Sequence, residues 1–257
     1  MIAKRSLVSS PSHSQTEVFF MARQVEIWNN RAEIASRALL LCQLAYNEAI
    51  AKNGRFTIVA AGGSTPRVLY ELLATKEWEW SKVHVFWGDE RYVPVSDPQS
   101  NEGMTRKAWL DLVAIPASNI HAIPTDPTDP TDPAIAANQY EQHIQEFFGV
   151  ASGEIPQFDL ILLGMGDDGH TASLFPHTKA LKVSDRLVTV GEKDGQPRIT
   201  MTAPLINQAK EIVFMVDGAA KAKALTAVLA PKGDVNLYPS RLITGNTIWL
   251  CDRTAKV

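Results

Sequence analysis

The chain has few cysteines, no long apolar run and almost no net charge. Its 257 residues include two cysteines, Cys42 and Cys251, and neither has a Cys or His neighbour at metal-site spacing, which argues against a zinc centre. No uninterrupted apolar stretch is long enough for a membrane span, so we predict none. A net charge of −3 provides no broad basic field for nucleic acid or anionic membrane, so any anion site must be local.

The rest of the composition is that of an ordinary globular protein. Hydrophobic residues make up 45% and charged residues 21%, which rules out a mainly disordered or coiled-coil chain. We expect a disordered tail over residues 1–16 and one α/β domain over residues 17–257. The tail lacks the solid apolar stretch of a signal peptide, so we expect a cytoplasmic location. We also expect a monomer. An organelle transit peptide stays open as an alternative, because the tail is basic, rich in serine and free of acids.

Short apolar runs alternate with helical patterns along the chain. Buried strands are predicted over 56–61, 83–87, 158–164, 212–216 and 247–250. Helices are predicted over 25–52, 68–74, 102–113 and 219–229, the first with Ile27, Ile34, Leu41, Leu44 and Ala45 on its buried stripe. The alternation predicts a mainly parallel sheet with helices on both faces. Ligands bind beyond the carboxyl ends of such strands, which directs attention to the loops after Ala61, Trp87, Leu163 and Val216.

A low-complexity segment separates two of these units. Residues 124–133 read Pro-Thr-Asp three times, followed by a final Pro. Proline cannot donate the hydrogen bonds of a central strand or helix, so we expect an exposed, partly extended connector.

The first candidate loop, Gly-Gly-Ser-Thr-Pro at 62–66, lies between a strand and a helix. Glycines allow close approach of a ligand, and free amides at a helix start attract phosphate. We therefore take Gly63, Ser64 and Thr65 as candidate ligand contacts. A tight turn with Ser or Thr as the helix cap is the alternative. The loop is neither a Walker motif nor a GxGxxG dinucleotide fingerprint.

The second candidate loop reads Gly-Asp-Glu-Arg-Tyr-Val-Pro at 88–94 and is followed by Asn101. Arg91 has the fork geometry that binds phosphate. Asp89 is suited to bind sugar hydroxyls or to move a proton. A solvated charged turn with an internal ion pair is the alternative.

The third candidate loop follows the clearest strand. It reads Gly-Met-Gly-Asp-Asp-Gly-His-Thr-Ala-Ser-Leu-Phe-Pro at 164–176. His170 and Asp168 have the parts of a general base and the group that orients it. The alternative is that His170 is a helix cap or an ordinary loop residue. Ser173 is a weaker candidate for a nucleophile, because Gly-x-Ser-x-Gly is absent.

Two basic residues complete the candidates. Lys221 lies in the first turn after a strand and a glycine, where a cation opposes the helix dipole unless an anion is bound. Arg198, in Arg-Ile-Thr-Met-Thr, is a less specific candidate for a polar ligand. The alternative for Lys221 is an ordinary surface lysine.

Taken in order, these five segments resemble the family of 6-phosphogluconolactonases and glucosamine-6-phosphate isomerases. The likeness runs from about residue 19 to residue 250. It implies a Rossmann-like fold and hydrolysis of 6-phospho-D-glucono-1,5-lactone, the second step of the oxidative pentose phosphate pathway, without metal or organic cofactor. On this resemblance His170 activates water, while the Gly-Gly-Ser-Thr loop, Arg91 and Lys221 hold the phosphate.

Two other functions stay open. The deaminases of the family typically carry tyrosine where this chain has Arg91, and an Asn-Glu-Pro-like stretch where it has residues 173–176. Both departures favour the lactonase. A non-catalytic protein that binds a phosphosugar is the third reading.

Overall fold

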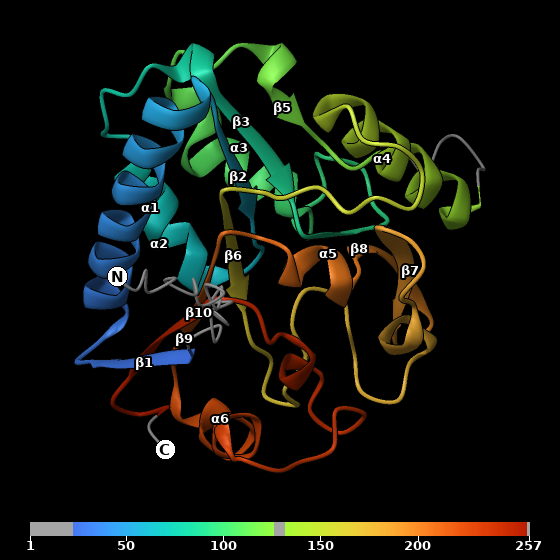
Figure 1. Ribbon diagram of the computed structural model, residues 1–257. Coiled ribbons are helices and arrows are strands. Elements are labelled where there is room, and N and C mark those ends of the chain that lie inside the picture. The colour runs from blue at the N-terminus through green and yellow to red at the C-terminus, as the bar shows by residue number, and fades with distance from the viewer. Residues whose placement is uncertain (1–22, 126–131, 256–257) are drawn as a thin grey trace, which may run out of the picture.

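The computed structural model describes residues 23–125 and 132–255 (Figure 1). The expected tail over 1–16 and most of the Pro-Thr-Asp segment lie outside these residues. At the far end of that segment, Asp132 caps a helix and Pro133 is its first residue. Proline suits this one helical position, because its missing N–H would have no partner there. The expectation of a connector through Pro133 was therefore wrong at its last residue.

A seven-stranded sheet forms the centre of the molecule. Every neighbouring pair of its strands is parallel. In spatial order the strands are β1 (Arg23–Trp28), β10 (Thr247–Asp252), β9 (Glu211–Val216), β6 (Leu160–Gly164), β2 (Phe56–Ala60), β3 (Val83–Trp87) and β5 (Ile120–His121).

Helices cover both faces of this sheet (Figure 1). Right-handed crossovers place α1 (Arg31–Asn53), α2 (Ser64–Leu73) and α3 (Asn101–Ala108) on one face. The same rule places α4 (Pro133–Phe148), α5 (Ala203–Asn207) and α6 (Ala222–Leu229) on the other. The predicted Rossmann-like α/β fold is thus confirmed. Short 3₁₀ turns lie at η1 (Trp80–Lys82), η2 (Leu110–Leu112), η3 (Ala117–Asn119), η4 (Lys179–Lys182), η5 (Ala219–Lys221) and η6 (Pro239–Leu242).

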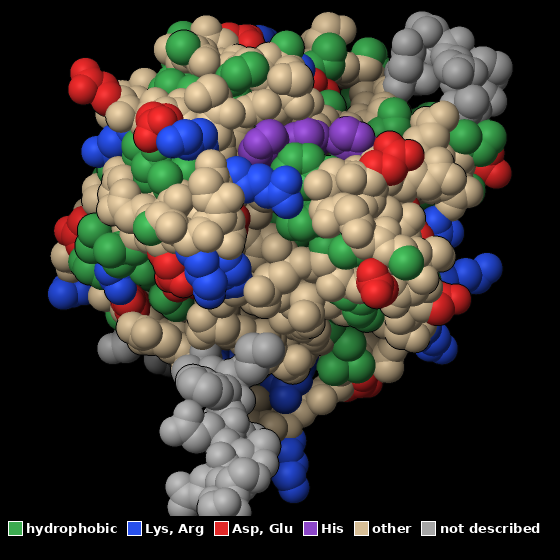
Figure 2. Space-filling view, turned by 45° about the horizontal axis from the view of Figure 1, so that its top comes forward, with side chains coloured by type: hydrophobic (Ala, Val, Ile, Leu, Met, Phe, Trp, Pro, Cys, Tyr) green, Lys and Arg blue, Asp and Glu red, His purple; other side chains and the backbone are tan. Residues whose placement is uncertain are grey.

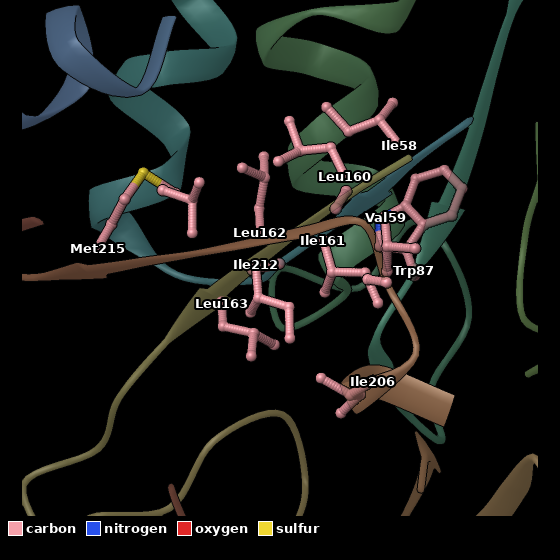
Figure 3. Close-up of a cluster of buried hydrophobic side chains, with 14 of the residues drawn as sticks. Ile58, Val59, Trp87, Leu160, Ile161, Leu162, Leu163, Ile206, Ile212 and Met215 are labelled. Atoms are coloured by element: carbon pink, nitrogen blue, oxygen red, sulfur yellow. The ribbon is translucent and has the colours of Figure 1, made fainter. Parts of the chain in front are cut away.

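The core lies around the central strands. The side chains of β2 are buried along its whole length, as are those of Leu160–Leu163 in β6, because helices cover both sides of the sheet. Figure 3 shows Ile58 and Val59 of β2 and Leu160–Leu163 of β6 in one cluster with Ile212 and Met215 of β9. This explains why the central strands were recognisable as unbroken apolar runs.

A second, three-stranded antiparallel sheet was not predicted. Its order is β4 (Asp89–Arg91), β8 (Gln196–Met201) and β7 (Val188–Lys193). These strands mix polar with apolar residues, so they lack the apolar runs that identified the buried strands. The sheet matters for the site because it brings residues of β7 and β8 beside the loop that follows β3.

The predicted opening helix was wrong over its first six residues. Residues Arg23–Trp28 form the edge strand β1, and Ile27, expected on the buried stripe, is 43% exposed there. The helix begins at Arg31, because the Asn30 side chain accepts a hydrogen bond from the Glu33 amide. Leu44, also expected to be buried, is 55% exposed.

The other predicted elements are found close to their predicted bounds. The helix predicted over 102–113 is shorter than expected, because α3 ends at Ala108 and continues only as the 3₁₀ turn η2. None of the helices in the described ranges combines the length and the apolar character that a membrane crossing needs.

The strand order also creates a topological switch point. The chain runs from β2 outward to β3 and β5, then returns to β6 on the other side of β2 and continues to β9. Connections leaving β2 and β6 therefore separate to opposite faces, and a crevice opens beyond their carboxyl ends.

Three histidines form a connected row at the β5 side of the sheet, visible on the surface in Figure 2. His84 Nδ1 lies 3.1 Å from His121 Nε2, and His121 Nδ1 lies 2.7 Å from His143 Nε2. Each contact needs one N–H donor and one bare nitrogen acceptor. The three neutral rings can bind one extra proton at an end of the row. A second extra proton would leave two N–H groups facing each other in one of the two contacts.

This row predicts a loss of stability in acid. Burial, followed by the charges of His143 and His84, lowers the pKa of His121 to about 3, and burial and Arg55 lower the pKa of His84. The unfolded chain therefore binds more protons below the ordinary histidine pKa, and stability falls as pH falls from about 6.5 toward about 3. For His121 alone we expect a loss of about 2 kcal/mol between pH 6.5 and pH 5.

Urea unfolding at a series of pH values measures this effect. His121→Gln should flatten the curve over that window, and His177→Asn, at an exposed histidine outside the row, should leave the slope unchanged. Parallel curves for wild type and His121→Gln would show that the row does not sense pH.

Candidate active site

The carboxyl ends of β2, β3, β6 and β9 open into one pocket of about 380 Å³. This is the position predicted from the strand pattern, at the switch point of the sheet. The second sheet closes the pocket on the side of β3. Nine of the ten residues predicted for the site line it: Gly63, Ser64, Thr65, Asp89, Arg91, Asn101, His170, Arg198 and Lys221.

The tenth predicted residue, Asp168, is not among the residues that line the pocket but contacts His170. Its Oδ1 is 2.5 Å from His170 Nδ1 and accepts a second hydrogen bond from the His170 amide at 3.0 Å. With Nδ1 bound to a carboxylate, the proton of a neutral ring is placed on Nδ1 and Nε2 is left as the basic nitrogen. The two residues thus have the arrangement of a base and its orienting carboxylate.

The environment keeps this carboxylate ionised. Burial acts to raise the pKa of Asp168, but the hydrogen bonds from the His170 side chain and amide outweigh it, helped by the charges of His170 and Lys193. The net result is a pKa of about 2. Asp168 therefore stays negative throughout the pH range in which histidine titrates.

Packing fixes the ring of His170 in place. A Cβ on Gly166 would lie 2.1 Å from His170 Nδ1, so only glycine leaves room for the ring. The ring of His170 also packs on the ring of Phe175, and the two ring centroids are 4.2 Å apart. Gly166 is therefore needed to seat the histidine.

Two arginines meet on neighbouring strands of the second sheet. Arg91 of β4 is directly opposite Arg198 of β8. Burial, and then the charge of Arg91, lowers the pKa of Arg198, and the buried Nε of Arg198 has no hydrogen-bond partner among the described residues. Like charges placed opposite each other are unfavourable. An anion bound between them would relieve the repulsion.

The loop that carries Arg91 is held by a buried acid. Glu90, only 2% exposed, accepts hydrogen bonds from the amides of Arg91, Asn101 and Glu102 at 2.7–2.8 Å. Burial raises the pKa of Glu90 in spite of these bonds. Asn101 in turn accepts a bond from Arg91 Nη1 and fills the space left by Gly62. The alternative of an ion pair within this loop is not supported, because no salt bridge among the described residues joins Asp89 or Glu90 to Arg91.

The Gly-Gly-Ser-Thr loop begins helix α2. Gly63 is the N-terminal cap, with a φ of 106° that favours glycine, and no side chain caps the helix. The alternative in which Ser64 or Thr65 caps the helix was therefore wrong. The Thr65 hydroxyl instead donates to Asp217, and the first turn of α2 faces the pocket.

Further pocket residues were not selected from the sequence. Asp217 pairs with Arg31 at 2.6 Å, and both line the pocket. Asp217 follows the end of β9, so its position was a usable signal, whereas nothing in the sequence pointed to Arg31. Lys221 donates to the Met165 carbonyl. Lys193 and Phe175 also contribute to the wall.

The weaker candidate nucleophile, Ser173, is bound elsewhere. Its hydroxyl donates to Asp89 Oδ2 at 2.6 Å, and no hydrogen bond joins it to His170 among the described contacts. A serine nucleophile needs a base within hydrogen-bond reach. Within 23–125 and 132–255 no group of three or more His, Cys, Asp or Glu is placed to hold a metal ion.

Comparison with known proteins bears on the family of the chain. Residues 29–249 match the family described as "Glucosamine-6-phosphate isomerases/6-phosphogluconolactonase". The 6-phosphogluconolactonase of Nostoc sp. (strain PCC 7120) is 54% identical over 237 residues, a match that spans 91% of this chain and 98% of the relative.

Solved structures share the fold. A 6-phosphogluconolactonase from Trypanosoma cruzi superposes with a TM-score of 0.81 at 27% identity, covering 91% of this chain and 96% of that one. A monomeric glucosamine-6-phosphate deaminase gives a TM-score of 0.74 at 19% identity, covering 90% and 98%, which shows the common fold alone. The chain therefore belongs to the family of glucosamine-6-phosphate isomerases and 6-phosphogluconolactonases.

Proposed function

We propose that this chain hydrolyses 6-phospho-D-glucono-1,5-lactone to 6-phospho-D-gluconate, without metal or organic cofactor. The observation that carries the proposal is that one pocket joins a basic group (Arg91, Arg198 and Lys221) to the His170–Asp168 pair. The substrate has a phosphate at one end and an ester carbonyl at the other. The names of its close relatives support the same activity.

The basic group is suited to hold the phosphate. Arg91 is directly opposite Arg198, and the first turn of α2 adds the amides of Ser64 and Thr65 and the hydroxyl of Ser64. Charge-assisted hydrogen bonds to phosphate are stronger than neutral ones, and helix N-termini favour anions. Asp89 and Asn101 also line the pocket, and in this proposal they bind sugar hydroxyls.

His170 then acts as the general base. Nε2 takes a proton from water while the water oxygen bonds to C1, and the carbonyl oxygen becomes an oxyanion. When this intermediate collapses, the bond from C1 to the ring oxygen breaks and His170 returns its proton to that oxygen. The carboxylic acid formed loses its proton to solvent. Asp168 holds the ring and stabilises its positive charge.

Two features oppose the deaminase activity found elsewhere in the family. Arg91 occupies the position where the deaminases typically have tyrosine, and residues 173–176 lack their glutamate. Phe175 stands at that place and packs on His170. The deaminase reaction needs ring opening and proton shuttling, and in this chain it would lack the glutamate side chain for these steps.

Three substrates test the proposal. In a pH-stat, wild-type protein should open the phosphorylated lactone faster than solvent does. It should be about 100-fold or more less efficient with unphosphorylated glucono-1,5-lactone, which loses at least two charge-assisted bonds of about 1.5–3 kcal/mol each. Glucosamine 6-phosphate should release no ammonia.

Other results would point to other functions. Ammonia release without lactone opening would establish a deaminase, and a ligand-induced shift in melting temperature without any turnover would indicate a binding protein. The cytoplasmic location and the monomeric state stay predictions from the sequence.

A further inference from the structure

The hairpin of β7 and β8 brings a lysine to the pocket from the second sheet. Lys193, at the end of β7, pairs with Gln196 across a turn whose residues Asp194 and Gly195 have φ values of 53° and 76°. Two positive φ values are typical of the tight hairpin turn that matches strand twist. The position of Lys193 is thus set by the hairpin, and its side chain lines the pocket.

The hairpin is seated directly on the loop that carries His170. Gly191, two residues before Lys193, packs so closely on Ser173 that a Cβ would lie 2.4 Å from the Ser173 carbonyl oxygen. Gly191 is also opposite Arg198. Because side chains alternate along a strand, Lys193 lies on the same face of the hairpin as Arg198, one step nearer the turn.

Lys193 also lies next to the His170–Asp168 pair. Its Nζ is 5.3 Å from the centroid of the Phe175 ring, which packs on His170, and its charge contributes to the low pKa of Asp168. No salt bridge of Lys193 occurs among the described residues, whereas Arg31 is paired with Asp217. Lys193 is therefore a cation near the base that has no carboxylate of its own.

The proposed reaction creates negative charge at this place. Attack of water on C1 makes an oxyanion, and the product carries a carboxylate on the same carbon. A donor placed where charge develops lowers the barrier. We propose that Lys193 binds the C1 oxygen, stabilising the oxyanion in the transition state and pairing with the carboxylate of the product.

This assignment rests on the proposed lactonase function and adds a catalytic residue to it. Proton balance is unchanged, because Lys193 stays an ammonium group and only donates hydrogen bonds. His170 still moves the proton from water to the ring oxygen. The phosphate is left to the basic group of Arg91, Arg198 and Lys221.

Lys193→Met tests the role in turnover. We expect kcat to fall about 10- to 50-fold, less than the roughly 10²–10³-fold known for a buried oxyanion donor because Lys193 is exposed. Lys193→Arg, which keeps the charge, should stay within about threefold of wild type. Lys232→Met, at an exposed lysine outside the pocket, is the matched control. An unchanged kcat in Lys193→Met would overturn the assignment.

A pair of ligands tests the position independently of turnover. Lys193→Met should bind 6-phosphogluconate about tenfold more weakly than wild type, and should bind glucitol 6-phosphate, which has no carboxylate, equally well. Equal weakening of both ligands would place Lys193 at the phosphate instead. This comparison tests the position of Lys193 even if the wild type proves not to be a lactonase. Unchanged binding of both ligands in Lys193→Met would overturn the assignment.

Discussion

Replacing His170 by alanine should lower kcat about 10²–10⁴-fold, the usual contribution of a general acid or base. In the proposed mechanism the side chain supplies Nε2 as the base, while the residues proposed to hold the phosphate, Arg91, Arg198 and Lys221, lie on β4, β8 and η5. Affinity for the product 6-phosphogluconate should therefore stay within about twofold of wild type. Steady-state kinetics together with calorimetric titration of the product measure both quantities.

His177→Asn, at an exposed histidine outside the pocket, is the control for this variant. It should retain wild-type kinetics, and the thermal transitions of both variants should show that they are folded. Equal loss of turnover and of product affinity in His170→Ala would contradict the separation of base and phosphate site.

Replacing Arg91 by alanine should raise KM about 10- to 100-fold with a much smaller change in kcat, because one to two charge-assisted bonds to the phosphate are lost. In the proposed binding mode Arg91 contacts the phosphate, far along the substrate from C1, so we expect it to contribute to ground state and transition state alike. The KM of Arg91→Lys should lie between those of wild type and Arg91→Ala, because lysine keeps the charge but lacks the planar fork of arginine.

The matched control for Arg91 is Arg67→Ala. Arg67 is an exposed arginine that pairs with Glu71 on the surface of α2 and does not line the active-site pocket. Its removal should leave KM unchanged. An unchanged KM in Arg91→Ala would remove this residue from the phosphate site.

The central strands could be predicted from the sequence because they are buried on both faces. Their apolar runs, such as residues 160–163, leave little doubt about the element, and the loops after four of these strands meet at one edge. The edge strand β1 was mistaken for helix because it is half exposed and directly precedes a true helix. Its pairing with β10, more than 200 residues away, leaves no local signal.

The residues of the site also differ in whether their contacts are local in the sequence or long-range. His170 and Asp168 are two residues apart in a distinctive loop, so their contact could be anticipated. Arg31 and Lys193 reach the pocket only through the long-range packing of α1 and of the second sheet, and their local sequence does not distinguish them from surface cations. The opposition of Arg91 and Arg198 likewise depends on the register of β4 with β8.

Hydrolysis of freshly prepared 6-phosphogluconolactone, coupled to 6-phosphogluconate dehydrogenase and NADP⁺, tests the account most directly. Wild-type protein, His170→Ala and a blank without enzyme should be compared in one experiment, because the lactone also opens spontaneously. We predict clear acceleration by the wild type and a rate close to the blank for His170→Ala. A wild-type rate equal to the blank would contradict the lactonase function, and full activity in His170→Ala would contradict the assigned base.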